Sequence, residues 1–354
     1  MGKVVVYTIP SVGHLNGILK TLRGMKVAVG TEFVVYCTEK YRDKIQDLGF
    51  EFRPYTISDD LVDTSIGSKL WTFKYEILKF TAENIDLLIS EIRGIDCSQI
   101  IFDTCAHWGK RVAELANIPS IAYFNYIAID KHFSKNFLAY ARTFNLKGLV
   151  DIRMYFKAKR YEFELKVVHG LKGFSLLNVL MGHSKVNWLQ YPKEMQPGKL
   201  DTKIGTWAPS VFIYNFIEED GKRPNIPLRK AVYVSAGTIN KSKRLFEKVK
   251  ELIDTEYTVY VHDKDRLCIE VGLTGKNIVI SSNFDQLHML RHCEYFITHA
   301  GMCSVLEAHN THCKMLYYPL QGEQAVTARM AVKNGWGKML KMNVPLKKQL
   351  ENLF

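Results

Sequence analysis

The sequence lacks several features that would assign it to a specialised class of protein. No stretch approaches the roughly 20 uncharged apolar residues that are needed to span a bilayer. The apolar run at the N-terminus is cut short by Pro10, so it lacks the hydrophobic region and cleavage site of a secretory signal. Hydrophobic residues make up 47% of the 354 positions, which excludes disordered, collagenous and low-complexity proteins. These absences predict a globular protein of the cytoplasm with no membrane anchor in this chain.

Cysteine pairs and the common ligand-binding motifs are also missing. The seven cysteines are odd in number and include no C-x-x-C pair, which predicts buried reduced thiols and neither a disulfide framework nor a zinc site. The chain has no G-x-G-x-x-G after its first strand, no G-x-x-x-x-G-K-[ST] and no H-E-x-x-H. The nicotinamide, P-loop and zinc-protease interpretations therefore lose their main support, and no metal or other cofactor is expected.

The charge balance is basic. The chain has 48 Lys and Arg against 36 Asp and Glu, which gives a net charge of +12 and favours anionic partners. Segment 131–172 alone holds ten basic and three acidic residues, interleaved with aromatic ones. Such a segment suits an anionic hydrophobic ligand or peripheral contact with a membrane surface, and equally a solvated face over an aromatic core. It lacks a nucleic-acid recognition motif, so a nucleic-acid partner is disfavoured.

The order of the predicted strands and helices indicates two α/β domains. A length of 354 residues predicts two domains. Strands and helices alternate from residue 3 to residue 124, and the alternation restarts at residue 230, which is typical of doubly wound parallel sheets. We therefore expect an N-terminal Rossmann-like domain over 1–200, a linker over 201–229 and a second Rossmann-like domain over 230–354. Ligands of such sheets bind beyond the carboxyl ends of the strands.

One loop after a strand of the second domain has the chemistry of an anion site. Residues 298–304 lie between an apolar strand and a helix, so free backbone amides and the positive end of the helix dipole point at one place. His299 can add a ring N–H and Ser304 a hydroxyl, which suits a diphosphate without requiring a metal ion. On the residues alone, the favoured interpretation is that Ser304 caps the helix and His299 is a buried turn residue.

The run over residues 295–337 resembles the nucleotide-binding signature of the UDP-glycosyltransferases of the macrolide-glycosyltransferase type. It shows an aromatic strand, a His-Gly-Gly-type turn, a Ser, a Glu, a strand ending in Pro and an acidic-Gln pair. Four further motifs lie before this run and occur in the same order as in that family. They are Gly13-His14-Leu15-Asn16, Asp103 with Trp108-Gly109, Ser235-Ala236-Gly237-Thr238 and Asn283-Phe284-Asp285-Gln286. The resemblance implies a GT-B fold, two Rossmann-like domains facing across a cleft, with the acceptor held by the first domain and a UDP-sugar by the second.

The resemblance also implies roles for the matched residues. The donor diphosphate would be held by Gly237, Thr238, His299, Gly301 and Ser304. The rest of the donor would be contacted by Glu307 at the ribose, by Phe284 and Gln286 at the uracil, and by Glu323 and Gln324 at the sugar hydroxyls. A carboxylate suits vicinal hydroxyls, and an amide suits mixed donors and acceptors.

His14 is the candidate general base. It follows the first strand, and an imidazole with an ordinary pKa near 6.5 can take a proton from an acceptor hydroxyl. Asp103, after another strand of the same sheet, would hold the other ring nitrogen and stabilise the imidazolium. The sugar would then be displaced in one step with inversion. The alternatives are a helix-start residue for His14 and a helix cap for Asp103.

The chain departs from the family pattern at several places. Ala300 replaces the second Gly of the turn, and Cys303 replaces an Asn near the leaving group, which predicts a weaker donor site or a different donor. Asp285 replaces a Pro in the uracil loop and would bring a carboxylate near an anionic ligand. The chain ends at Phe354, where the next helix of the family would be under way, so the closing helix is expected to be missing.

Three functions therefore compete on the sequence. The leading one is a metal-independent, inverting glycosyltransferase that moves a hexose, glucose by preference, from a UDP-sugar to a hydroxyl of a small apolar acceptor. The second is a peripheral-membrane glycosyltransferase that acts on a lipid. The third is a catalytically impaired GT-B-like protein that only binds a ligand.

Overall fold

The computed structural model describes residues 2–29, 31–57, 59, 70–128, 152–171, 179, 182–197, 211–214, 228–237, 242–320 and 322–353. The chain divides into two compact units, which are described separately below. The first unit comprises Met1–Pro192 and Gly198–Phe216, and the second comprises Lys193–Pro197 and Ile217–Phe354.

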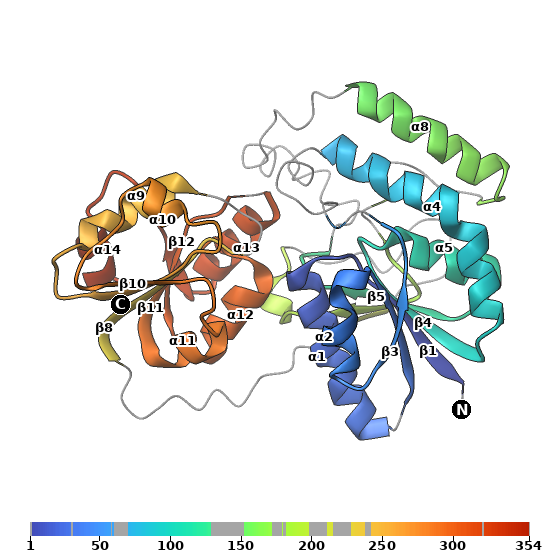
Figure 1. Cartoon of the computed structure of the whole chain (residues 1–354), viewed down its shortest axis with the longest axis horizontal. Coiled ribbons are helices and arrows are strands. Elements are labelled where there is room, and N and C mark those ends of the chain that lie inside the picture. Colours follow the sequence, from blue (N-terminus) through green and yellow to red (C-terminus); the bar gives the residue numbers. More distant parts are fainter. Residues whose placement is uncertain are drawn as a thin grey trace. The chain divides into compact units, whose positions relative to one another are not determined.

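The first unit is built on a seven-stranded sheet in which every described strand pair is parallel (Figure 1). The order is β3-β2-β1-β4-β5-β6-β7, so β1 lies between β2 and β4. The chain thus reverses its direction of winding at β1 and β4, where doubly wound sheets place their ligand sites. The strands are β1 (Lys3–Tyr7), β2 (Phe33–Cys37), β3 (Glu51–Pro54), β4 (Cys97–Asp103), β5 (Ser120–Phe124), β6 (Val186–Leu189) and β7 (Val211–Tyr214).

Helices pack against the first sheet because its strands are apolar on both faces. On one face the side chains of Val4 and Val6 join the apolar side of α1, including Leu15 and Leu19. Aromatic rings of strand and helix residues pack together elsewhere in the core, with Trp108 fully buried. The described helices of this unit are α1 (Val12–Val29), α2 (Arg42–Gln46), α4 (Leu70–Arg93), α5 (His107–Ala116) and α8 (Ile152–Val167), with a short 3-10 helix at Glu39–Tyr41.

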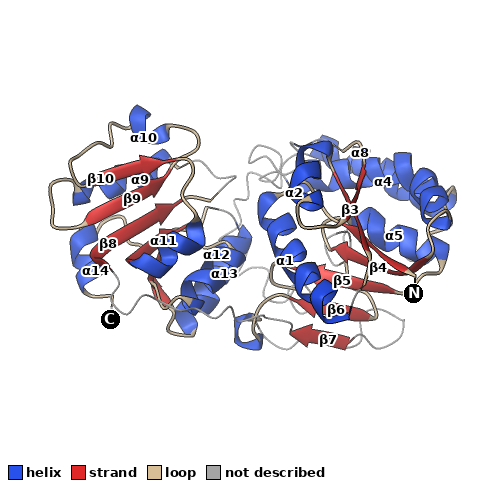
Figure 2. Cartoon of the chain, turned by 60° about the horizontal axis from the view of Figure 1, so that its bottom comes forward, coloured by secondary structure: helices blue, strands red, loops and turns tan. Residues whose placement is uncertain are grey.

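The second unit contains a six-stranded sheet in the order β10-β9-β8-β11-β12-β13, again with parallel pairs (Figure 2). Its strands are β8 (Leu228–Ser235), β9 (Thr258–His262), β10 (Ile278–Ser281), β11 (Cys293–Thr298), β12 (Lys314–Tyr317) and β13 (Gly337–Met339). Its helices are α9 (Lys243–Val249), α10 (Leu267–Glu270), α11 (Gln286–His292), α12 (Met302–Asn310), α13 (Gly322–Lys333) and α14 (Leu346–Glu351), with short 3-10 helices at Lys193–Met195 and Lys250–Leu252.

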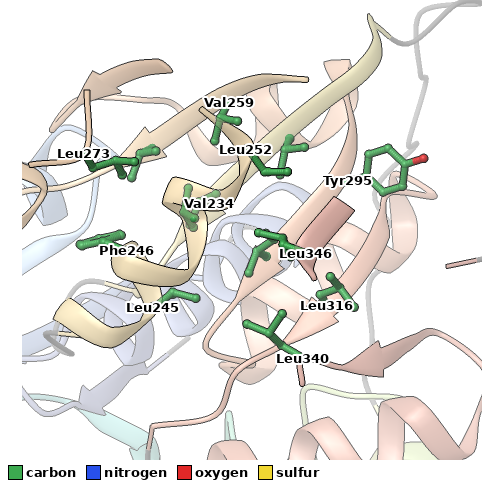
Figure 3. Close-up of a cluster of buried hydrophobic side chains, with 14 of the residues drawn as sticks. Val234, Leu245, Phe246, Leu252, Val259, Leu273, Tyr295, Leu316, Leu340 and Leu346 are labelled. Atoms are coloured by element: carbon green, nitrogen blue, oxygen red, sulfur yellow. The ribbon is translucent and has the colours of Figure 1, made fainter. Parts of the chain in front are cut away.

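The end of the chain closes the core of the second unit. Leu340 and Leu346 pack with Val234 and Phe246 in one buried apolar cluster (Figure 3). The side chain of Lys248 is buried and holds the loop before α14 in place. Its ammonium group donates to the carbonyls of residues 342 and 344 at 3.1 and 2.8 Å. The last described residues are therefore part of the folded unit.

The chain passes between the units at places that differ from the expected linker. The sequence predicts a linker over 201–229, but Val211–Tyr214 within it form β7 and pair with β6. Residues Lys193–Pro197, expected in the first domain, belong to the second unit, where Asn334 donates to the carbonyl of Glu194 at 3.0 Å. Pairing at a sheet edge is a long-range interaction, so the composition of this segment did not reveal it.

Gly109 marks the close approach of α5 to the sheet. A Cβ atom at this position would lie 2.7 Å from Cβ of Phe102 and 2.9 Å from Cβ of Tyr7, on the neighbouring strands β4 and β1. The Trp108-Gly109 pair of the family resemblance is thus explained by packing, with a buried indole and a glycine that lets the helix approach the sheet.

We predict that Gly109→Ala destabilises the first unit by about 1–3 kcal/mol, because atoms next to the strand backbone cannot move aside for the added methyl group. Urea unfolding measures the change. Gly13→Ala is the matched control, since no atom lies within 4 Å of the corresponding Cβ, and its effect should stay within about 0.5 kcal/mol. Equal stability of the two variants would contradict the packing argument.

Candidate functional site

The structure brings His14 and Asp103 together in the first unit. His14 lies in the first turn of α1, directly after β1, and Asp103 is the last residue of β4, the neighbouring strand. Nδ1 of His14 is 2.6 Å from Oδ2 of Asp103. The Asp103 side chain is fully buried, whereas 23% of the His14 side chain is exposed. The arrangement leaves Nε2 as the ring nitrogen that is not bonded to Asp103.

Asp103 uses its second oxygen to shape its own loop. Oδ1 accepts a hydrogen bond from the backbone N–H of Cys105 at 2.8 Å, and the Asp103 carbonyl accepts from the N–H of Ala106 at 2.8 Å. These bonds form the turn before α5, but the N-cap of α5 is Ala106 and no side chain caps the helix there, so the interpretation of Asp103 as a helix cap is wrong. One oxygen organises the turn and the other orients the imidazole.

Two residues that the sequence reasoning missed surround this pair. The side-chain amide of Asn125 donates to the His14 carbonyl at 3.1 Å, and the Tyr126 ring lies with its centroid 6.0 Å from that of His14. Both follow β5, another strand of the same sheet. The rule that sites collect beyond the carboxyl ends of parallel strands could have found them.

The short distance between Nδ1 of His14 and Oδ2 of Asp103 fits a hydrogen bond better than two ligands of one metal ion. His14, Asp103 and Cys105 offer ligand atoms that all lie within 4.8 Å of one another, and this is the group of potential metal ligands in the described part of the chain. Ligands at about 2.0–2.2 Å from one tetrahedral ion lie roughly 3.3 Å apart. At 2.6 Å the nitrogen and oxygen are at hydrogen-bond distance instead.

In the second unit, the His299 ring lies between two glycines. A Cβ atom on Gly237, in the turn after β8, would lie 2.6 Å from Cε1 of His299, and a Cβ on Gly301 would lie 2.6 Å from Nε2. Gly237 has a φ of +84°. The backbone N–H of His299 donates to the carbonyl of Ser235 at 3.3 Å, because β8 and β11 are parallel neighbours. Two turns that each follow a strand thus meet at one imidazole.

Ala300 adopts a backbone conformation that favours glycine. Its φ is +66°, in the left-handed region, and its N–H donates to Oγ1 of Thr298 at 3.2 Å. The residue is fully buried, so the methyl group packs into the protein and does not line an exposed edge. An alanine in this conformation costs about 1–2 kcal/mol in backbone strain relative to glycine.

Burial keeps the His299 ring neutral at physiological pH. It lowers the pKa of this histidine from 6.5 to about 4, and a hydrogen bond with the Ser235 backbone offsets part of the shift. A neutral imidazole still carries one ring N–H, which can donate to an anionic oxygen.

Three residues predicted from the resemblance form one hydrogen-bonded group in the second unit. Gln286, the first residue of α11, donates through Nε2 to Oε2 of Glu307 at 2.6 Å and to Oγ of Ser304 at 3.2 Å. Ser304 and Glu307 lie on successive turns of α12. Asp285 caps α11 by accepting from the N–H of His288 at 3.1 Å, which explains a carboxylate at this position.

An aromatic group adjoins this cluster. Phe284 makes edge-to-face contacts with Tyr233 and Tyr260, at centroid distances of 6.3 and 6.0 Å. Tyr233 in turn stacks on Phe296 at 5.2 Å. Phe284 is half-buried, so part of its ring remains accessible.

The remaining predicted donor-site residues differ in how far they are buried. Cys303 is half-buried in the first turn of α12 and Glu323 is exposed in the first turn of α13. Gln324 is buried, and its Oε1 accepts from the N–H of Leu320 at 2.9 Å, so the amide oxygen shapes the loop before α13. Thr238 lies outside the described residues, as does 131–151 of the basic segment.

Comparisons with known proteins show what the chain is similar to. The family model described as UDP-glucoronosyl and UDP-glucosyl transferase matches residues 272–353, which include His299, Ser304 and Glu307. The chain is similar to the UDP-glucosyltransferase YojK of Bacillus subtilis, with 22% identity over 96% of this chain and 85% of that protein. The chain is thus similar to the UDP-glycosyltransferases, through the family model over its C-terminal part and through relatives over nearly its whole length.

Solved structures show the fold of this chain. The kitacinnamycin glycosyltransferase matches 99% of this chain and 90% of its own at 19% identity, with a TM-score of 0.74. A UDP-glucose:anthocyanidin 3-O-glucosyltransferase in complex with UDP matches 99% of this chain and 89% of its own at 17% identity, with a TM-score of 0.65. The fold is GT-B, and the similarity to these relatives supports a nucleotide-sugar-dependent glycosyltransferase.

The depressed pKa of His299 predicts a pH dependence of stability. Between pH 6.5 and about 4 the unfolded chain binds a proton at this residue and the folded chain does not, so the free energy of unfolding falls as the pH falls. We predict that His299→Gln makes the free energy of unfolding less dependent on pH in this range, by the contribution of about one proton.

Urea unfolding across that pH range measures the effect, and histidine proton shifts in NMR report the titration of His299 directly. His107, whose pKa burial also lowers, should keep its share of the dependence in the variant. An identical pH dependence in the variant and the parent protein would refute the prediction.

Proposed function

We propose that the protein transfers a hexose, taken to be glucose, from a UDP-sugar to a hydroxyl of a small apolar acceptor, with inversion at the anomeric carbon. The observation that carries this proposal is the contact between His14 and Asp103. It pairs a partly exposed imidazole with a fully buried carboxylate at the edge of the first sheet. The free thiol state of all seven cysteines supports action in the cytoplasm.

In the proposed mechanism, His14 acts as the general base. Nε2 accepts the proton of the acceptor hydroxyl while the hydroxyl oxygen forms a bond to the anomeric carbon. The bond from that carbon to the diphosphate oxygen breaks at the same time, and UDP leaves with the electron pair. Asp103 holds Nδ1–H, which orients the ring and stabilises the imidazolium that forms. Attack opposite to the leaving group inverts the anomeric centre.

The donor would bind in the second unit. The neutral ring of His299, together with the backbone amides at Gly237 and Gly301 and the N-terminus of α12, would contact the diphosphate. Glu307 would accept hydrogen bonds from the ribose hydroxyls. Its present partner, the Gln286 amide, is suited to the edge of the uracil, with Phe284 beside it.

Donor affinity tests this half of the proposal. We predict that calorimetry detects selective binding of UDP or a UDP-sugar over ADP and GDP, with EDTA present, because the proposed site needs no divalent metal. TDP-glucose tests the choice of base. Absence of binding by every uridine and thymidine diphosphate would overturn the donor site.

We predict that His299→Ala weakens UDP binding by about 10- to 100-fold, since a hydrogen bond to a charged oxygen is worth about 1.5–3 kcal/mol. His292→Ala is the matched control, because this half-buried histidine on α11 is engaged with the carbonyl of His288. Unchanged affinity in His299→Ala would remove this residue from the phosphate site.

We predict that His14→Ala lowers kcat by about 10²- to 10⁴-fold, the usual contribution of a general base, while UDP affinity changes less than about twofold. Turnover of UDP-glucose in the presence of a phenolic acceptor panel measures the first quantity, and calorimetry measures the second. Arg23→Ala, an exposed change on the same helix, serves as the control. Full turnover by His14→Ala would exclude this residue as the base.

A further inference from the structure

Helix α8 forms an outer layer of the first unit, packed on α4 (Figure 1). Its inner side is well packed, because Ala158 and Leu165 are fully buried. Tyr155 lies edge-to-face against Trp71 of α4 at a centroid distance of 4.9 Å, and Tyr161 lies 5.7 Å from Tyr75. The aromatic residues of the basic segment thus serve partly as a core stripe, which was one of the two interpretations of the sequence.

The outer side of α8 carries an apolar stripe that this packing does not cover. Phe156, Phe163 and Val167 are 64%, 65% and 63% exposed. Their spacing of seven and four residues places all three on one line along the helix, because residues seven or four apart share a face. Single exposed apolar side chains are common on protein surfaces, but two phenylalanines and a valine in line are the pattern of a binding face.

Basic residues border the apolar stripe on both sides. By helical position, Arg153 and Arg160 lie on one side of it, and Lys159 and Lys166 lie on the other. Arg153, Lys159, Arg160 and Lys166 are all exposed. The face therefore combines a hydrophobic centre with positive edges.

The acidic residues of α8 offset the positive charge of this face only in part. The Glu162 side chain is only 5% exposed and lies between Lys159 and Lys166, with contacts of 2.7 and 2.8 Å. Glu164 is half-buried. Two glutamates stand against five exposed Lys and Arg residues, so α8 keeps a net positive charge.

We propose that the outer side of α8 docks on the surface of an anionic lipid bilayer. The apolar stripe would enter the boundary between headgroups and acyl chains, and the flanking cations would contact the lipid phosphates. This is the geometry of an interfacial helix, which lies in the plane of the membrane. No helix in the described part of the chain is long and apolar enough to cross a membrane, so the contact is peripheral. The docking goes beyond the proposed transfer reaction and does not depend on the identity of the donor.

Vesicle co-sedimentation tests the proposal with the full chain. We predict binding to vesicles of phosphatidylcholine with phosphatidylglycerol and much weaker binding to phosphatidylcholine alone. Binding should fall as salt rises, because the lipid surface potential is screened within a Debye length. Arg153→Gln/Arg160→Gln should weaken it by about 25-fold, at about fivefold for each cation lost near the surface.

Phe156→Ser/Phe163→Ser removes the apolar stripe while leaving the charges in place, and should weaken vesicle binding by about tenfold or more. Ile269→Ser is the matched control, because Ile269 is an apolar side chain of the second unit that is 70% exposed. This variant should bind vesicles like the parent protein. Calorimetry with UDP on the same variants should show unchanged donor affinity, which separates a failure of docking from a failure of the donor site.

Three results would each overturn the proposal. The first is wild-type protein that fails to sediment with anionic vesicles. The second is binding that the phenylalanine variant or neutral lipid leaves unchanged, which would assign it to another surface. The third is a dimer in solution that Phe156→Ser/Phe163→Ser dissociates, which would assign the face to a second copy of the chain.

Discussion

The parallel pairing of β1 with β4 is the constraint on which the candidate site of the first unit depends. Val6 lies opposite Ile101 and Tyr7 opposite Phe102, so both strands end at the same edge of the sheet. The helix after β1 then presents His14 to the carboxylate that ends β4, across 89 positions of sequence. In the second unit, the pairing of β8 with β11 does the same for Gly237 and His299, whose ring fills the space a side chain would need.

The two histidines show how the environment divides one residue type between two kinds of chemistry. His14 is partly exposed and shares its Nδ1 with a buried carboxylate, an arrangement that stabilises positive charge on the ring. His299 is packed between glycines and has its pKa lowered to about 4 by burial, an arrangement that keeps the ring neutral. The first suits a group that takes up a proton, and the second suits a hydrogen-bond donor to an anion.

Much of the architecture could be predicted because it depends on local pattern. The alternation of strands and helices indicated two parallel α/β units, and the loops after strands indicated where His14, Asp103 and His299 lie. Strand β7 could not be predicted in the same way, because Val211–Tyr214 become a strand only by pairing with β6. Asn125 was missed although it follows a strand, since an isolated amide has no motif of its own.

The sequence by itself determined the periodicity, the family motifs and the absence of the other common ligand motifs, because each of these is written within a few neighbouring residues. Only the tertiary structure decided which side chains share a partner. In the structure, Gln286 donates a hydrogen bond to Glu307, Asp285 caps a helix, and the amide oxygen of Gln324 accepts from a backbone N–H. The tertiary structure also divided the aromatic residues of α8 between a buried and an exposed side, because burial depends on which neighbouring element covers a face, and that contact is not encoded in the spacing along the chain.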